Sequence, residues 1–242
     1  MEYYSEFIWE RNDREVNEDS LAINQVVLGN RTLLMAVLCD GIGSLPEGEI
    51  AGSYVVSSMK TLFEGLRKDR NPRLSAIKNA IGRQLYSCHE TLRERGIGTT
   101  VCMVVIYDRK ALFIHAGDSR IYLRKEKFRQ IGRDHTDEAG RLVRAIGVGQ
   151  YRKMDYCIKR LGKKHSILIC TDGFYKRIDK ELKRGNCFLR HATEEERYAE
   201  LRRMYETAKQ RGEKDNSSAV YIWQENAVKM KERRKNDRKN NG

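Results

Sequence analysis

The chain is poor in the features that mark membrane, secreted and disordered proteins. Among its 242 residues there are only two prolines and no low-complexity tract. The longest uninterrupted apolar run, residues 33–39, has seven residues, whereas a membrane-spanning helix needs about 20. The first ten residues, MEYYSEFIWE, contain neither a basic stretch nor an apolar one, so no secretory signal is expected. These absences predict a cytoplasmic globular protein without a membrane span.

Cysteine is present but not in any pattern that predicts a metal site or a disulfide framework. The six cysteines are scattered, none forms a CxxC pair, and none lies beside a histidine at zinc-site spacing. Most of them interrupt apolar stretches, as Cys39, Cys102 and Cys170 do. We therefore expect small buried thiols in a reducing compartment.

Charge is unbalanced toward the basic side. Lysine and arginine number 47 against 34 acidic residues, and residues 229–242 alone hold seven basic and two acidic residues. A basic surface attracts nucleic acid, anionic membranes or phosphorylated proteins. Nucleic acid is disfavoured because there is no recognition-helix pattern and no alternation of aromatic and basic residues. We expect one domain over residues 1–226 and a basic, disordered tail over 227–242.

Hydrophobic periodicity predicts strands in two blocks, with helices between and after them. Strands are expected at residues 3–9, 20–28, 32–39, 99–107, 111–116, 119–124, 127–131, 152–159, 165–171 and 217–223. A first helix covers residues 50–66, and a second is expected to be capped by Asn71 and to end at Gly96. A third starts at Thr193, where Glu196 three residues later makes a capping box, and stops at Gly212.

This order of elements is not a βαβ alternation. An apolar helix face needs a sheet to cover, and a strand that is apolar throughout, such as residues 33–39, needs packing on both of its faces. The sequence therefore predicts an α+β fold: a four-layer α-β-β-α sandwich of two antiparallel sheets flanked by helix pairs.

Acidic residues recur at the predicted strand ends, beside small residues. They are Glu18-Asp19, Asp40-Gly41, Asp118, Asp172-Gly173 and Asp215-Asn216. If several of these ends meet at one edge of the sandwich, their charges repel one another unless a cation lies between them. Oxygen ligands alone favour magnesium, manganese or calcium over zinc. The alternative is that each Asp-Gly pair is an ordinary turn.

At these residues the chain resembles the metal-dependent protein phosphatases of type 2C, above all their compact bacterial catalytic domains. The resemblance rests on RxxNEDS (14–20), VLCDGIGS (37–44), GxxAGS (48–53), GTT (98–100), GDSR (117–120), DHT (134–136), TDG (171–173) and DNS (215–217). Each motif is weak alone, but eight in this order and spacing are specific. The resemblance covers about residues 5–224, nearly the whole chain.

The resemblance implies a centre of two Mn²⁺ or Mg²⁺ ions at one end of the sandwich. Asp40 would bridge both ions, and the carbonyl of Gly41 would join it. Asp172 and Asp215 would hold one of the ions. A water or hydroxide bridging the two metals would then attack the phosphorus of phosphoserine or phosphothreonine directly, without a covalent enzyme intermediate.

Further roles follow from the same resemblance. Glu18 or Asp19 would hold the second ion, directly or through water. Asp118 together with Asp172 matches a third, weaker metal position, so the number of ions is two or three. Arg14 matches the arginine that binds the substrate phosphate, where its guanidinium fork suits two oxygens. Arg14, Asp40 and Asp172 are thus the expected catalytic residues.

The sequence departs from the family pattern in four places. Ile42 stands where many members have a histidine that protonates the leaving group, so no general acid is assigned. Ser44 replaces a usual glycine, and the final motif reads DNSS rather than DNxT. Only residues 137–144 separate the DHT motif from Ala145-Ile146-Gly147, where the family inserts a longer flap.

The resemblance implies phosphorylated protein substrates, a cognate serine/threonine kinase as a partner, and a monomer. Signalling is the expected cellular role. Because the flap is short, one alternative is a catalytically weak member that serves as a regulatory or binding module. A second alternative is a nucleic-acid-binding protein driven by the basic charge, which would bind with a steep salt dependence.

Overall fold

The computed structural model describes residues 2–184 and 193–225. The first half contains β1 (Glu2–Glu10), β2 (Asp19–Leu28), β3 (Arg31–Asp40), α1 (Gly48–Leu66), α2 (Leu74–Arg95), β4 (Val101–Tyr107) and β5 (Lys110–Ala116). The second half contains β6 (Arg120–Arg124), β7 (Phe128–Ile131), β8 (Asp155–Arg160), β9 (Ser166–Cys170), α3 (Asp172–Tyr175), α4 (Asp179–Arg184), α5 (Glu194–Gln210) and β10 (Ser217–Glu225). The predicted basic tail, residues 227–242, lies outside the described residues.

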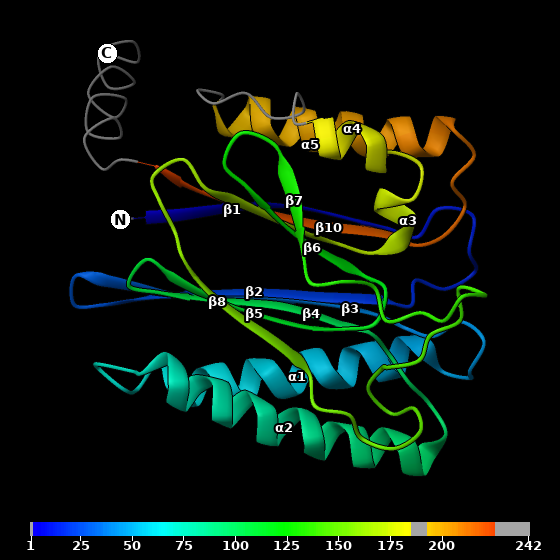
Figure 1. Cartoon of the computed structure of the whole chain (residues 1–242), viewed down its shortest axis with the longest axis horizontal. Helices are drawn as coiled ribbons and strands as arrows, with labels where there is room; N and C mark the ends of the chain where they lie inside the picture. The colour runs from blue at the N-terminus through cyan, green and yellow to red at the C-terminus, as the bar shows by residue number, and fades with distance from the viewer. Residues whose placement is uncertain (1, 185–192, 226–242) are drawn as a thin grey trace.

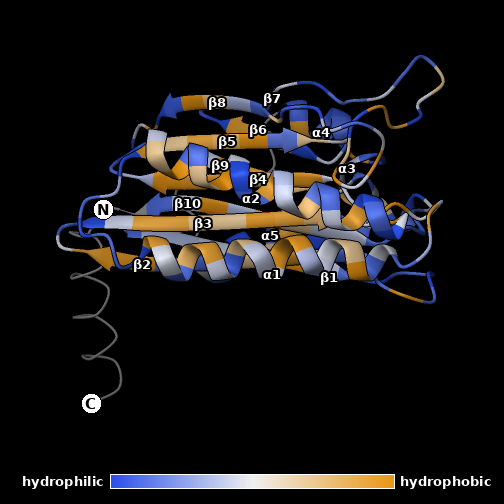
Figure 2. Ribbon diagram, turned by 90° about the horizontal axis from the view of Figure 1, so that it is seen from below, coloured by the Kyte–Doolittle hydropathy of each residue, from blue (hydrophilic) through white to orange (hydrophobic). Residues whose placement is uncertain are grey.

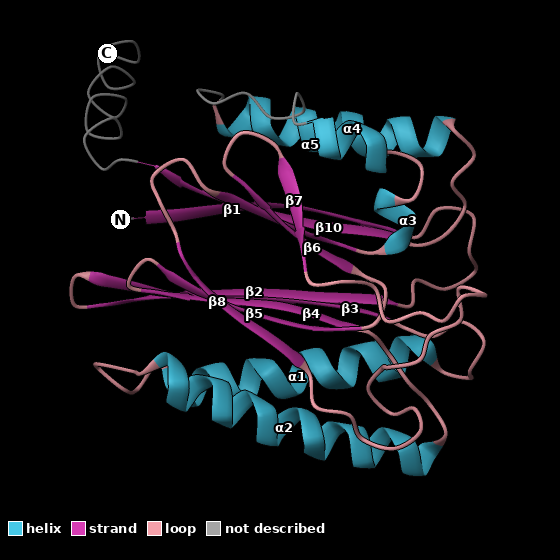
Figure 3. Ribbon diagram, viewed as in Figure 1, coloured by secondary structure: helices cyan, strands magenta, loops and turns pink. Residues whose placement is uncertain are grey.

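The strands form two five-stranded antiparallel sheets, in the orders β1-β10-β9-β6-β7 and β2-β3-β4-β5-β8. The sheets stack face to face, with α1 and α2 covering the second and α4 and α5 covering the first (Figures 1 and 3). This arrangement confirms the predicted α-β-β-α sandwich. In the described residues, no helix is long and apolar enough to cross a bilayer.

Three apolar layers hold the sandwich together, and β3 contributes to two of them. Leu33, Met35 and Val37 belong to the cluster that packs against α1 and α2, while Leu34 and Ala36 belong to the cluster between the sheets. Because successive side chains of a strand point to opposite faces, both faces of β3 are buried. That is why its sequence is apolar without alternation. A third cluster packs the other sheet against α3, α4 and α5.

The helices that cover the sheets have one apolar face and one polar face. In Figure 2 the ribbon of α1 carries hydrophobic and hydrophilic bands in turn, as expected for a helix with one buried face. Its buried positions include Val55, Met59 and Phe63, at spacings of four residues. The amphipathic helices therefore cover the outer faces of the sheets, as the sequence predicts.

Some local predictions hold and others are wrong. Thr193 caps α5 through the predicted capping box, in which it exchanges hydrogen bonds with Glu196. Asn71 does not cap α2, whose N-cap is Arg73. The Asn71 side chain instead accepts hydrogen bonds from Arg31 (3.1 Å) and from the Tyr107 hydroxyl (3.4 Å). Helices α3 and α4 were not predicted, because they have only four and six residues.

The cysteines behave as small apolar residues. Cys39, Cys88, Cys102 and Cys170 are buried, Cys157 is partly exposed, and all five are free thiols. Cys187 lies outside the described residues. Buried free thiols agree with the interpretation made from the sequence.

Candidate active site

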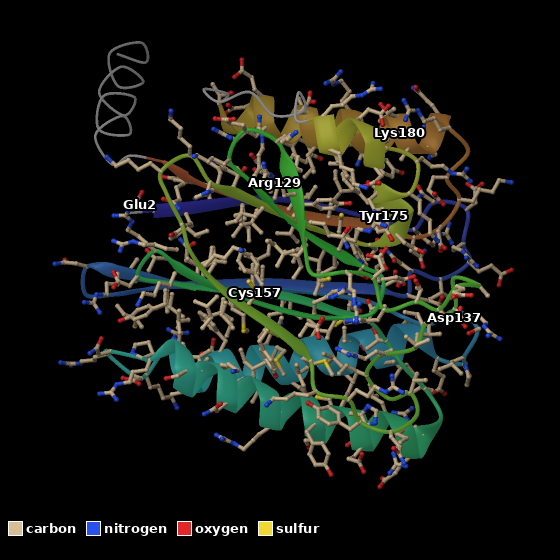
Figure 4. The ribbon with its side chains drawn as sticks, in the orientation of Figure 1. Glu2, Arg129, Asp137, Cys157, Tyr175 and Lys180 are labelled. Carbon is tan, nitrogen blue, oxygen red and sulfur yellow. The ribbon has the colours of Figure 1, made fainter. Side chains whose placement is uncertain are left out.

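One end of the sandwich collects the strand ends that carry the acidic motifs. Figure 4 shows labelled Tyr175 and Asp137 at this end and labelled Glu2 at the opposite end. In the sheet β2-β3-β4-β5-β8, Asp19 begins β2 and is paired in register with Asp40, which ends β3. The antiparallel register therefore brings two motifs that lie about twenty residues apart in the sequence to neighbouring positions.

The end of β3 is held by two threonines of the GTT motif. The carbonyl of Asp40 accepts hydrogen bonds from the Thr100 amide (2.8 Å) and the Thr99 hydroxyl (2.9 Å). The Thr100 hydroxyl accepts from the Asp40 amide at 3.1 Å and lies 2.8 Å from the Ser119 hydroxyl. These bonds fix the backbone of Asp40 and join it to the turn that carries Asp118.

The other sheet brings Asp172 and Asp215 to the same end. Asp172 starts α3 and is separated from the end of β9 by Thr171 alone, and Asp215 lies two residues before β10. Gly173 packs so closely on the second segment that a Cβ at this position would come 2.2 Å from the Asn216 carbonyl oxygen. The Ser217 hydroxyl also donates to the Gly173 carbonyl at 2.7 Å. Residue 173 must therefore be glycine for the two aspartates to approach each other.

Acidic side chains from both sheets line a single cavity of about 160 Å³. Its lining residues are Arg14, Glu18, Asp40, Gly41, Ile42, Gly43, Ser44, Thr100, Asp118, Leu142, Asp172 and Asp215. Asp19 does not line the cavity: it is buried beneath it, and its Oδ2 accepts a hydrogen bond from the Thr171 hydroxyl at 3.1 Å. Of the adjacent pair at the start of β2, Glu18 is thus the residue that faces the cavity.

Burial and mutual repulsion raise the pKa values of several carboxylates at this site. Burial raises the pKa of Asp40 well above its usual range, and the negative charges of Asp19 and Asp172 raise it further. Burial likewise raises the pKa of Asp19 to about 7. Burial and the charge of Asp172 raise the pKa of Asp118. Such a cluster is costly when fully ionised, and cations bound among its oxygens would offset that cost.

The donor set fits hard divalent cations. Every acidic ligand candidate offers carboxylate oxygens, which suit Mn²⁺ or Mg²⁺ better than zinc. One oxygen of Asp19, Oδ1, is buried without a hydrogen-bond partner among the described residues. Gly48 leaves room for the Glu18 carboxylate, because a Cβ at position 48 would lie 2.5 Å from one of its oxygens. The residues present are therefore suited to hold the metals that the sequence motifs imply.

Two basic side chains contact the acidic cluster from its rim. Arg14 donates from Nε to Oδ1 of Asp215 (2.9 Å) and from Nη2 to Oδ2 (3.0 Å), a two-bond ion pair. Lys176 forms an ion pair with Oδ2 of Asp172, four residues before it. Both basic side chains are about half exposed. They place positive charge at the cavity mouth, where an anionic substrate would enter.

A second titratable cluster lies beside the cavity. His115, His135 and Asp155 offer ligand atoms within 4.8 Å of one another. His135 accepts the Gly117 N–H at Nδ1 (3.1 Å), so its proton lies on Nε2, which faces Asp155 at 3.1 Å. Arg144 donates to the other oxygen of Asp155. With its Nε2 lone pair unavailable, His135 positions the loop before Asp118 rather than ligating a metal.

His115 gives this cluster a defined pH response. Its ring is buried, Nε2 lies 2.8 Å from the Ser119 carbonyl, and burial lowers its pKa to about 4. His135 lowers the pKa further, whereas Asp134 and Asp155 oppose the shift. The unfolded chain binds a proton near pH 6.5 and the folded chain only near pH 4. Stability is therefore lost as the pH falls between these values.

We expect this residue to account for about 3 kcal/mol of lost unfolding free energy between pH 6.5 and pH 4. Urea unfolding of the protein and of His115→Gln across that range measures the effect. The variant should show a shallower decline in unfolding free energy as the pH falls. Equal slopes for the two proteins would contradict the buried, neutral state of His115.

Sequence reasoning missed two residues at the cavity. Leu142 comes from the short segment 137–144, which folds as a turn: the Asp137 side chain accepts hydrogen bonds from the Ala139 and Arg141 amides. Nothing in that segment's sequence shows that Leu142 would line the site. Lys176 had a detectable signal, because it follows Asp172 by four residues, the spacing of a helical ion pair.

The fold and the cavity together define a class of α-β-β-α proteins that gather carboxylates at one end of a two-sheet sandwich. The family model for protein phosphatase 2C matches residues 10–214. The chain therefore belongs to the protein phosphatase 2C family.

Relatives of known structure and sequence agree with this family. The serine/threonine phosphatase Stp1 of Staphylococcus aureus is 22% identical, with a TM-score of 0.79 over 93% of this chain and 96% of that one. The Mycobacterium tuberculosis phosphatase PstP/Ppp is 20% identical, with a TM-score of 0.73 over 93% and 99%. Protein phosphatase PhpP of Streptococcus pneumoniae is 26% identical over 131 residues, 51% of each chain. The match thus spans about half the length of such curated relatives.

Proposed function

We propose that this protein hydrolyses phosphoserine and phosphothreonine in other proteins with the help of divalent metal ions. The observation that carries the proposal is the single cavity lined by carboxylates from both sheets, together with one guanidinium. Membership of the phosphatase 2C family supports the same reaction. In this account the substrates are the products of serine/threonine kinases, and the protein acts as a monomer in cytoplasmic signalling.

The cavity residues take different roles in holding the ions. Asp40 and Gly41 both line the cavity. We assign the Asp40 carboxylate to both Mn²⁺ or Mg²⁺ ions, with the Gly41 carbonyl as a further ligand. Asp172 and Asp215 would hold one ion from the opposite sheet, and Glu18 would face the other. Bound there, the ions would supply an activated water for attack on phosphorus. The chain itself contributes the placement of these oxygens, fixed by backbone bonds such as those to Asp40.

Asp19 and Asp118 lie at the edges of this arrangement. Asp19 is buried below the cavity and supports the start of β2 through its bond to Thr171. We assign it to a position behind Glu18, where it contributes negative charge to the ions. Asp118 lines the same cavity as Asp172 and completes its acidic lining.

Arg14 is the group best placed to bind the substrate phosphate. Its side chain is about half exposed at the cavity mouth, and its guanidinium already makes two parallel hydrogen bonds to a carboxylate. A phosphoryl group presents oxygens with the same spacing, so the fork can bind two of them. Its positive charge offsets the charge on the phosphoryl oxygens during displacement. Ile42, which also lines the cavity, cannot donate a proton to the leaving group.

Phosphate release from a phosphothreonine peptide tests the proposal. We expect turnover with Mn²⁺, none after chelation with EDTA, and recovery when Mn²⁺ is returned. A folded protein that shows no turnover with Mn²⁺ or Mg²⁺ would contradict the proposal. That result would instead favour the regulatory module considered for a member with a short flap. Deleting residues 229–242 should leave kcat in saturating substrate unchanged, because the described residues that line the cavity all lie between Arg14 and Asp215.

A further inference from the structure

Lys176 is held beside the acidic cavity by the helix that begins at Asp172. Its amide donates to the Asp172 carbonyl at 2.8 Å, closing one helical turn. Its ammonium forms an ion pair with Oδ2 of the same residue. The backbone and side-chain contacts together direct the positive charge of Lys176 at Asp172.

The segment that carries this ammonium also contacts Asp118. The preceding residue, Tyr175, donates from its buried hydroxyl to the Asp118 carbonyl at 3.0 Å, which ties α3 to the turn between β5 and β6. Asp118 and Asp172 line the same cavity. Lys176 in turn feels the charges of Asp172, Asp118 and Asp215. The ammonium is thus paired with Asp172 and acts electrostatically on Asp118, and both carboxylates line one cavity.

We propose that the Lys176 ammonium is the permanent cation of the Asp118–Asp172 pair, so that this centre binds two divalent ions and excludes a third. The inference rests on the proposed function, since it concerns the same cavity. A further divalent ion on this pair would have to displace a tethered positive charge or share the carboxylates with it. Either arrangement is opposed by like-charge repulsion.

A second ion pair in the chain shows what distinguishes Lys176. Lys183 contacts Asp179, also four residues earlier, at 2.6 Å and with the same side-chain exposure of 55%. Asp179 is already paired with Arg120 at 3.1 Å and does not line the cavity. Lys183 therefore provides a matched control: the same local geometry without a site for a divalent ion.

The number of bound ions tests the proposal. The protein, Lys176→Met, Lys176→Arg and Lys183→Met are dialysed against saturating Mn²⁺, and bound manganese is measured by mass spectrometry. We expect two ions per chain for the protein, for Lys176→Arg and for Lys183→Met, and three for Lys176→Met. Lys176→Met should also show a larger rise in Tm on addition of Mn²⁺ than the protein does, because more ions stabilise its folded state.

The outcomes separate this inference from the proposed function. Three ions in the unmodified protein, or two in Lys176→Met, would overturn the role of Lys176 and leave the two-ion phosphatase intact. No bound manganese in the unmodified protein, together with no phosphate release, would overturn both. Lys176→Arg keeps the positive charge, so a third ion in that variant would also contradict the proposal.

Discussion

Replacing Asp40 by asparagine is expected to reduce phosphate release by about 10³-fold or more without unfolding the protein. Metal ions supply several kcal/mol of transition-state stabilisation, and each 1.4 kcal/mol corresponds to a factor of ten. Asp40 faces the other carboxylates of the cavity, and its pKa is raised by burial and by their charges. Asparagine removes that repulsion, so with EDTA present the variant should have an equal or higher Tm.

Steady-state kinetics with Mn²⁺ and thermal unfolding with EDTA measure the two effects. Asp108→Asn is the matched control: Asp108 lies in the turn between β4 and β5, with φ of 49°, a conformation that asparagine also adopts. The control should retain full activity. Activity of Asp40→Asn within tenfold of the unmodified protein, or its unfolding in EDTA, would contradict the assigned role.

Gly173→Ala should both destabilise the protein and weaken its metal binding. The added Cβ would lie 2.2 Å from the Asn216 carbonyl oxygen and 3.2 Å from the Cβ of Asp215. The backbone on one side has to move, which costs about 1–3 kcal/mol in a well-packed region. Because Asp172 and Asp215 lie on the two sides of this contact, their carboxylates would also move apart. Urea unfolding and a Mn²⁺ titration report the two losses.

Gly65→Ala is the control for this substitution. Gly65 lies near the end of α1, and a Cβ there has no neighbouring atom within 4 Å. Alanine in a helix is favoured over glycine by roughly 0.5–1 kcal/mol, so stability should be unchanged or slightly higher. If Gly173→Ala binds Mn²⁺ as tightly as Gly65→Ala does, the close contact does not position the two aspartates.

The layers of the fold could be predicted from the sequence because apolar residues recur with the period of the strand or helix whose face they bury. The apolar run of β3 indicates a strand that is buried on both faces. The spacing of Val55, Met59 and Phe63 indicates a helix, α1, that is buried on one face. The capping box at Thr193 was also readable, since both partners lie within four residues. Asn71 was misread because its side chain bonds to Arg31 and Tyr107, which are distant in sequence.

The residues of the candidate site could be predicted only from short motifs, because the spacing of apolar residues gives no information about them. In the sequence, an aspartate that follows a strand cannot be told from an aspartate in an ordinary turn. Asp40 and Asp172 come together only because the two sheets stack on each other. Leu142 had no signal, because its place depends on how the Asp137 turn folds. The choice between Glu18 and Asp19 likewise needed the structure, which places the first in the cavity and the second beneath it.

Anomalous diffraction from crystals grown with Mn²⁺ tests the central claim most directly. The account predicts manganese peaks between the two sheets, within ligand distance of the carboxylates of Asp40, Asp172 and Asp215. Carboxylates that point away from one another, with no manganese among them in crystals saturated with the metal, would contradict it.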